Sequence, residues 1–393
     1  MADDVGVVRE AAGEHRPAFL ELFFDLVFFL ALIVLAADLS ATLTWLAAGQ
    51  TLILFLAFAL VWALSSWVAD TSDLNHPRGQ VQVFWVMTGS LVMSAAVPEA
   101  FDGRGLLFAM GYLAIQLGSA TYLMITGRRE IVRIRNRRIL FWAGISAVAW
   151  LAGAFLPNTQ RTALWALAIT IEYTAAVLGW PTPKLGHSVG WEWKLVGERV
   201  AERYRQLLII ALGVSVFKAG LTLGPDNYTA YRVAAFGMAF ATAVLMWRIY
   251  IYRAGELLPD AIVASTNPSR FGQFAAVSHL VMVAGIILAA AGTALVIDNP
   301  LHPTHPGPGA IMLGGSILFL VGRGVLAYTV FSQVSWTRPV GIILIGLLAA
   351  AFPVLPQLTI MALVTFILLL IALADSFNFG IRPGPATPPQ LPF

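Results

Sequence analysis

Long apolar runs dominate this sequence and restrict what it can fold into. A helix needs about 20 mostly apolar residues to cross a bilayer, and twelve runs of that kind occur. Charged residues make up only 11% of the chain, whereas a soluble domain carries about 25%. Such a chain cannot form a water-facing surface but can form a lipid-facing one. The predicted spans are 20–39, 43–68, 81–99, 105–126, 139–156, 162–180, 206–223, 229–252, 272–297, 310–331, 339–355 and 357–375.

These runs predict an all-α, polytopic integral membrane bundle of about 10–12 transmembrane helices. Backbone groups in lipid must be satisfied within the segment, which favours helices, and the runs lack the alternation of barrel strands. The last two spans are separated only by residues 352–356, which could form a kink, a tight hairpin or a re-entrant turn. The expected organisation is a cytoplasmic segment 1–18, a helix bundle 19–376 and a disordered, Pro-rich cytoplasmic tail 377–393.

The distribution of basic residues predicts the orientation. Residues 127–138 carry six arginines, and cytoplasmic loops are enriched in Lys and Arg. Strict alternation then places both termini in the cytoplasm, with 18 of the 24 basic residues on that side. Twelve spans could also form two halves of six, as in many carriers, but the sequence shows no convincing repeat between such halves.

Four acidic residues gather near the predicted cytoplasmic mouth. Glu21 and Asp25 are four residues apart, on one face of the first helix. They could face a cation or polar cavity, or simply favour the helix dipole. Asp70 and Asp73 follow the second helix. They could bind a cation or a proton, or belong to a solvated turn.

Four further polar residues lie within predicted helices. Glu172, Lys218 and Arg323 are charges at membrane depth, where an unpaired charge costs several kcal/mol or more. Glu172 is therefore expected to pair with Lys218 or Arg323, as a functional or a purely structural ion pair. His279 could relay protons or be a hydrogen-bonded core histidine.

The segment 191–204 mixes aromatic residues with both signs of charge. It is typical of an interfacial helix that leads into the seventh span, with Trp191 and Trp193 as anchors. The chain has no cysteine, no phosphate-binding Gly-Lys-Ser/Thr loop, no His-Glu-x-x-His motif and no nucleophile elbow. A net charge of +3 does not indicate a nucleic-acid surface.

The opening segment, residues 20–28, resembles the signature that begins the bacterial low temperature requirement protein A (LtrA) family. Residues 70–73 resemble an Asp-Thr-Asp-Asp stretch of that family, with Ser72 in place of one aspartate. Further similarities lie at 96–101, 202–213, 247–252 and 278–279, in the same order. The resemblance reaches to about residue 375 and implies a multi-pass protein of the bacterial inner (plasma) membrane.

Two positions depart from the family pattern. Val214 follows Leu212-Gly213 where the family usually has Glu, and Arg199 stands where it usually has His. A carboxylate and an imidazole expected near the seventh helix are therefore missing, which would alter any proton or ion step that used them.

The leading hypothesis is a gradient-driven transporter or channel-like protein without a cofactor. Its pathway would be lined by Glu21, Asp25, Asp70, Asp73, Glu172, Lys218, His279 and Arg323. The alternative is a membrane-embedded enzyme acting on a lipid-phase or prenyl diphosphate substrate. In it, Asp70 and Asp73 would hold Mg²⁺ and Glu21 and Asp25 would assist catalysis. A non-catalytic sensor is a third option. The expected partners are the lipid bilayer, an unidentified small molecule, ion or lipid-phase substrate and, in a homo-oligomer, a second copy of the chain, but no nucleic acid.

Overall fold

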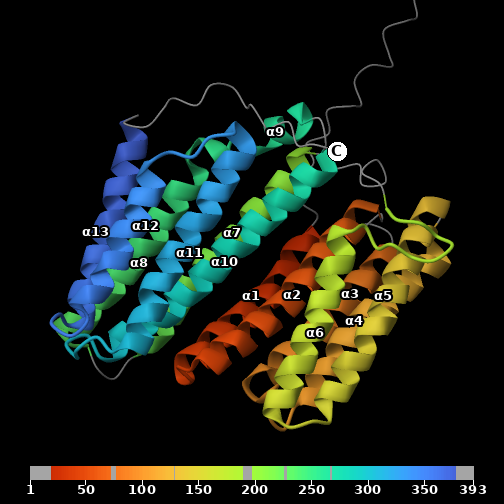
Figure 1. The fold of residues 1–393 in the computed structure, drawn as a ribbon, viewed down its shortest axis with the longest axis horizontal. Helices are drawn as coiled ribbons and strands as arrows, with labels where there is room; N and C mark the ends of the chain where they lie inside the picture. The colour runs from red at the N-terminus through yellow and green to blue at the C-terminus, as the bar shows by residue number, and fades with distance from the viewer. Residues whose placement is uncertain are drawn as a thin grey trace, which may run out of the picture.

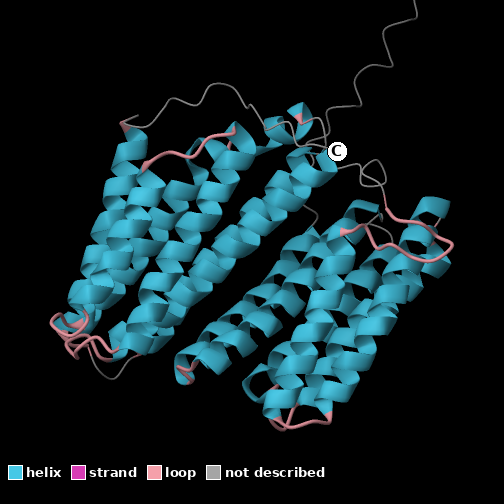
Figure 2. Ribbon diagram, viewed as in Figure 1, coloured by secondary structure: helices cyan, strands magenta, loops and turns pink. Residues whose placement is uncertain are grey.

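The computed structural model describes residues 19–71, 77–127, 129–188, 197–224, 228–265 and 268–377. The described chain consists of helices joined by short loops (Figure 2). The α-helices are α1 (Phe19–Ala41), α2 (Trp45–Thr71), α3 (Pro77–Ala96), α4 (Gly105–Thr126), α5 (Glu130–Ala154), α6 (Asn158–Val177), α7 (Gly197–Leu223), α8 (Ala230–Tyr250), α9 (Leu258–Ala264), α10 (Pro268–Asp298), α11 (Pro306–Phe331), α12 (Thr337–Leu347) and α13 (Gln357–Ser376). Short helical turns η1 (Val97–Glu99), η3 (Ile251–Gly255) and η4 (Leu348–Ala351) extend α3, α8 and α12.

Each predicted span coincides with one of these helices, so the all-α, multi-pass prediction is confirmed. Within the described residues, nine helices are long and apolar enough to cross a membrane. The predicted spans outside that group are α5, α6 and the shorter α12. The last two predicted spans are separate helices, because α12 and α13 pack against each other as a hairpin. The terminal segments 1–18 and 378–393 lie outside the described residues.

Two boundaries differ from the sequence prediction. The predicted arginine-rich loop is largely helical, because α5 begins at Glu130 rather than near residue 139. Arg138 is buried there and donates to the carbonyl oxygen of Leu185 at 2.6 and 3.1 Å. Residues 197–204, expected in an interfacial helix, form the first turns of α7, while Trp191 and Trp193 lie outside the described residues.

The helices form two groups that lie side by side (Figure 1). We call α1–α6 the first half and α7–α13 the second half. The first helix of one half packs against the first helix of the other, α1 against α7, and α1 also packs against α10. The short α9 follows α8 and precedes α10 along the chain, and it has no counterpart in the first half.

The two halves repeat one packing order. When α1 to α6 are matched in sequence with α7, α8, α10, α11, α12 and α13, packed pairs in the first half recur in the second. The matching pairs are α1–α2 with α7–α8, α1–α3 with α7–α10, α2–α3 with α8–α10, α3–α4 with α10–α11, α4–α5 with α11–α12, α5–α6 with α12–α13, α2–α6 with α8–α13 and α2–α4 with α8–α11. The hypothesis of two related halves therefore gains structural support.

Glycines mark the same crossing in both halves. A Cβ added to Gly89 on α3 would lie 3.4 Å from the carbonyl oxygen of Gly111 on α4. A Cβ on Gly285 of α10 would lie 2.7 Å from that of Gly315 on α11. Small residues let membrane helices approach this closely.

The glycine register also repeats. On α4 the glycines are Gly105, Gly111 and Gly118, and on α11 they include Gly309, Gly315 and Gly322, with the same spacings of six and then seven residues. The last helix of each half begins after an N-cap proline, Pro157 for α6 and Pro356 for α13. The repeat is thus visible in residues as well as in packing.

Candidate functional site between the two halves

The bundle has two chemically different ends. The connection between α4 and α5, with Arg129 and the arginines of the first turns of α5, lies at the end that we call the basic end. It is uppermost in Figure 1. The connection between α1 and α2 lies at the opposite end. Both halves begin at the basic end, so corresponding helices run in the same direction.

A buried ion pair joins the halves near the basic end. Asp25 of α1 accepts hydrogen bonds from Arg203 of α7, with Oδ1–Nη2 and Oδ2–Nη1 distances of 3.2 Å. The exposed fractions of the two side chains are only 5% and 8%. Arg203 also donates to Gln206 one turn later at 3.1 Å. Two charges in this environment are stable only because they compensate each other.

Aromatic rings connect this pair to His279. The guanidinium of Arg203 lies 5.4 Å from the centre of the Trp62 ring on α2, within the range of a cation–π interaction. Trp62 contacts Tyr204 with ring centres 6.2 Å apart, and Tyr204 stacks on His279 of α10 at 4.5 Å. The network therefore contains side chains from α1, α2, α7 and α10, and so from both halves.

The hydrogen bonds of His279 indicate its protonation pattern. Its Nδ1 lies 2.7 Å from the carbonyl oxygen of Ala275, so Nδ1 carries a proton and donates it. Its Nε2 lies 3.1 Å from the hydroxyl of Tyr250 on α8. An imidazole protonated on Nδ1 alone accepts at Nε2, so Tyr250 donates to it. His279 is thus a buried, hydrogen-bonded histidine at the edge of the inter-half network.

Arg323 supports this network from the second half. Buried on α11, it donates to the carbonyl oxygens of Ile249 at 2.8 Å and Tyr252 at 2.7 Å. These carbonyls lie where α8 passes into the π-helical turn η3. Such turns break the regular helical bonding pattern and often occur at functional sites. Arg323 therefore stabilises the end of α8 that presents Tyr250 to His279.

A cleft lies between the halves towards the end of the bundle opposite the basic end. It has a volume of about 740 Å³ and is lined by α2 from the first half and by α10 and α11 from the second. Its lining is almost entirely apolar. One exception is Thr51, which is buried and whose hydroxyl has no hydrogen-bond partner among the described residues. The halves are therefore joined by charge near the basic end and separated by a hollow near the opposite end.

Glu172 does not form the expected ion pair. It is buried within the first half and accepts hydrogen bonds from Tyr112 of α4 and from Ser146 and Trp150 of α5. The expected partner Arg323 bonds to carbonyls in the second half instead, and Lys218 lies half-buried on α7. Hydroxyl and indole donors, rather than a cation, therefore satisfy this carboxyl group.

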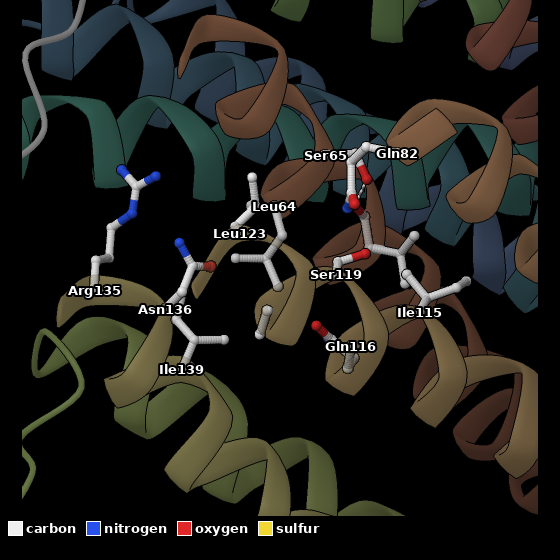
Figure 3. Close-up of a pocket in the computed structure, with 12 residues that line it drawn as sticks. Leu64, Ser65, Gln82, Ile115, Gln116, Ser119, Leu123, Arg135, Asn136 and Ile139 are labelled. Carbon is white, nitrogen blue, oxygen red and sulfur yellow. Dashed lines mark hydrogen bonds between the residues drawn. The ribbon is translucent and has the colours of Figure 1, made fainter. Parts of the chain in front are cut away.

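A small cavity with both apolar and polar side chains in its lining, which we call the polar cavity, lies beside the Glu172 cluster, towards the basic end. It is lined by side chains of α2, α3, α4 and α5, including Gln82, Gln116, Ser119, Arg135 and Asn136 (Figure 3). Its volume of about 30 Å³ exceeds the 10–15 Å³ or so that one water needs. The Glu172 cluster and this cavity together form the second candidate functional site.

The remaining predicted residues are only partly placed. Glu21 and Asp70 lie on α1 and α2 near the basic end, but their side chains are outside the described part, as is all of Asp73. No cluster of three or more metal-binding side chains occurs among the described residues. The large apolar cleft lies at the other end of α2 from Asp70. A prenyl chain bound in this cleft would therefore not lie beside Asp70, as the enzyme hypothesis requires.

The sequence prediction missed Arg203, Tyr204, Trp62 and Tyr250. Arg203 and Tyr204 were assigned to an interfacial helix because charges of both signs surround them. A second buried pair was also missed. Within the second half, Arg338 of α12 donates to Asp375 of α13 at 2.5 and 2.7 Å. One signal was available for both pairs, namely a lone carboxylate among apolar residues, which requires a partner.

The fold and these sites define an α-helical, multi-pass membrane protein made of two related halves. Residues 16–373 match the family described as Bacterial low temperature requirement A protein (LtrA), and the chain belongs to this family. It is 31% identical over 370 residues to RA0937, an uncharacterized protein of Rhizobium meliloti (strain 1021), in a match that covers 93% of this chain and 90% of the relative. No solved structure matches the chain.

Proposed function

We propose that the protein is a gradient-driven transporter of the bacterial inner membrane, with the basic end in the cytoplasm and a substrate route between the two halves. One observation carries the proposal. The halves are held together near the basic end by the buried Asp25–Arg203 pair, and near the opposite end they enclose a cleft of about 740 Å³. Alternating access requires a route that is closed on one side of the membrane and accessible on the other.

The chemistry of the closed end supports a link to an ion gradient. Protonation of Asp25, or binding of a cation to it, would remove the charge that holds Arg203. The inter-half contact would then weaken, and the halves could separate near the basic end. The apolar lining of the cleft favours an apolar or amphipathic solute, with Thr44 and Thr51 as the polar side chains of the lining.

A flux measurement tests this function even though the solute is unidentified. Proteoliposomes are loaded with a defined mixture of polar, amphipathic and apolar metabolites. After a proton or sodium gradient is imposed, mass spectrometry identifies any solute released. We expect at least one solute to move in a gradient-dependent manner with the wild-type protein and more slowly with Asp25→Asn.

The matched control is Asp375→Asn, which breaks a buried Asp–Arg pair within one half. It should retain flux in proportion to the amount of folded protein. If no solute moves under either gradient, or if both variants behave alike, the proposal is wrong.

A further inference from the structure

A buried carboxyl group without a counter-charge lies within the first half. Glu172 is 6% exposed, and the side chains that donate to it, Tyr112, Ser146 and Trp150, are all neutral. The titratable groups around it are Tyr112 on α4 and Tyr173 on α6, and the hydroxyl of Tyr173 is bound to the carbonyl oxygen of Leu56 on α2 at 2.9 Å. None of the described basic side chains forms an ion pair with Glu172. Its ionised form therefore depends on hydrogen bonds alone.

The same surroundings can accept the neutral acid. The hydroxyl of Ser146 donates to Glu172 Oε1, but it also lies 3.1 Å from the carbonyl oxygen of Ala143. If Glu172 takes up a proton on Oε2, it can donate that proton to the Tyr112 oxygen, because a hydroxyl both donates and accepts. Ser146 and Trp150 can still donate to Oε1. The Tyr112 hydrogen then turns towards Gln116, whose amide must turn over to present its oxygen. The site can therefore hold either protonation state with its hydrogen bonds satisfied.

A chain of polar groups leads from Glu172 towards the basic end. Tyr112 bonds to Glu172, and the amide nitrogen of Gln116 lies 3.0 Å from the Tyr112 hydroxyl. Gln116 also lines the polar cavity shown in Figure 3. It is thus the side chain that links the buried carboxyl cluster to the cavity.

The cavity has the chemistry of a water site. The Gln82 amide nitrogen and the Ser119 hydroxyl both line it, are buried and have no hydrogen-bond partner in the described protein. Buried polar atoms of this kind are normally satisfied by protein or by ordered water. A water there would have Gln82, Ser119 and Gln116 as partners, which meets the usual need for two to four.

From this geometry we infer that Glu172 is a reversible proton-binding site supplied with protons through the water cavity, past Gln116 and by way of Tyr112. The step balances as a proton relay. When the Gln116 amide turns away from the Tyr112 hydroxyl, a hydronium from the cavity can take its place and give a proton to the Tyr112 oxygen. The original Tyr112 proton passes to Glu172 Oε2, and a neutral water remains. Protonation of Glu172 stands independently of transport, whereas its use as a coupling step rests on the proposed function.

Infrared difference spectroscopy on the purified, full-length protein tests the inference directly. A protonated carboxyl group has a C=O band that disappears on ionisation and shifts in D₂O. We expect a band that titrates with pH, and we expect it to be absent in Glu172→Gln. Asp375→Asn, the matched control, should keep the band.

Two further variants test the route and the site separately. Gln116→Leu should slow the hydrogen–deuterium exchange of this band about tenfold, equivalent to about 1.4 kcal/mol on a barrier, without moving the titration midpoint. Tyr112→Phe should move the midpoint because it removes a hydrogen bond to the carboxylate. A shifted midpoint in Tyr112→Phe also assigns the band to Glu172 if the Glu172→Gln protein cannot be purified.

Three results would overturn the inference. In the first, no band assigned to Glu172 titrates. In the second, Gln116→Leu leaves the exchange rate unchanged. In the third, the band responds to sodium at constant pH, which would make the site a sodium site. Because none of these measurements requires transport, failure here differs from failure of the flux experiment, which would remove the transporter instead.

Discussion

The Asp25–Arg203 pair should be energetically coupled across the two halves. The perturbation is a double-mutant cycle of Asp25→Asn, Arg203→Gln and the double variant. With facing atoms 3.2 Å apart and an effective dielectric constant near 20, the attraction is about 5 kcal/mol. Removing one partner of such a buried pair typically costs about 3–5 kcal/mol because the other charge is left unpaired. The double variant leaves no charge behind, so we expect a coupling energy of about 2–4 kcal/mol.

Equilibrium unfolding in mixed micelles with increasing sodium dodecyl sulfate measures this coupling. The control cycle uses Glu99 and Arg104, which are 3.3 Å apart but half-exposed. Solvent screening should reduce their coupling to about 1 kcal/mol or less. If the two cycles give the same small value, the charge pair does not hold the halves together and the reasoning about the closed end is refuted.

Two further predictions concern packing and polar contacts. Gly315→Leu should prevent close packing of α10 and α11, because even a Cβ would lie 2.4 Å from the backbone nitrogen of Ala289. Its neighbour Gly314→Ala should be tolerated, because there the nearest atom is a side-chain carbon at 3.7 Å. Size-exclusion chromatography in detergent distinguishes the two, and a monodisperse Gly315→Leu protein would contradict the packing account. Tyr250→Phe should destabilise the protein by about 1–3 kcal/mol, because it leaves the buried Nε2 of His279 unsatisfied. Unfolding measurements check this against Tyr228→Phe, an exposed control expected to be neutral, and equal stabilities would count against the assigned hydrogen bond.

The sequence predicted the approximate positions of α1–α8 and α10–α13 because that information is local, but it did not predict the short α9. Each span is one run of apolar residues, and lipid requires such a run to be helical. The predicted start of α5 was wrong because the prediction used only this local information. Its first turns carry arginines, which are typical of a loop, yet Arg138 donates to the carbonyl oxygen of Leu185 and to the Ser188 hydroxyl and can therefore be part of a packed helix.

The repeat between the halves was not recognised from the sequence, although a signal was present. The spacing Gly105, Gly111, Gly118 on α4 recurs as Gly309, Gly315, Gly322 on α11. At Gly111, Gly315 and Gly322 an added Cβ would lie 3.3, 2.4 and 2.8 Å from backbone atoms of the neighbouring helix, so a close crossing favours glycine there. The intervening lipid-facing residues are free to vary within the apolar set, so overall similarity between the halves is weak.

The candidate sites were only partly predictable. Asp25 and His279 stand out as polar residues in apolar helices, but their partners come from helices distant in sequence. Asp25 and Arg203 are 178 residues apart. For Glu172 the sequence suggested a cation, whereas the structure supplies hydroxyl and indole groups. Tyr, Ser and Trp are common in membrane helices, so composition does not reveal which of them face a buried carboxyl group.

Cysteine accessibility shows whether the Asp25–Arg203 pair controls access between the halves, and the chain contains no cysteine to interfere. Thr51→Cys reports on the cleft, and Ala275→Cys, buried one turn before His279, reports on the closed end. Each is combined with Asp25→Asn or with the control Asp375→Asn and treated with a membrane-impermeant thiol reagent. We expect Asp25→Asn to make Ala275→Cys react faster and Thr51→Cys react more slowly, and we expect Asp375→Asn to change neither rate. If both cysteines keep their rates in Asp25→Asn, or both become faster, the ion pair does not control alternating access between the halves.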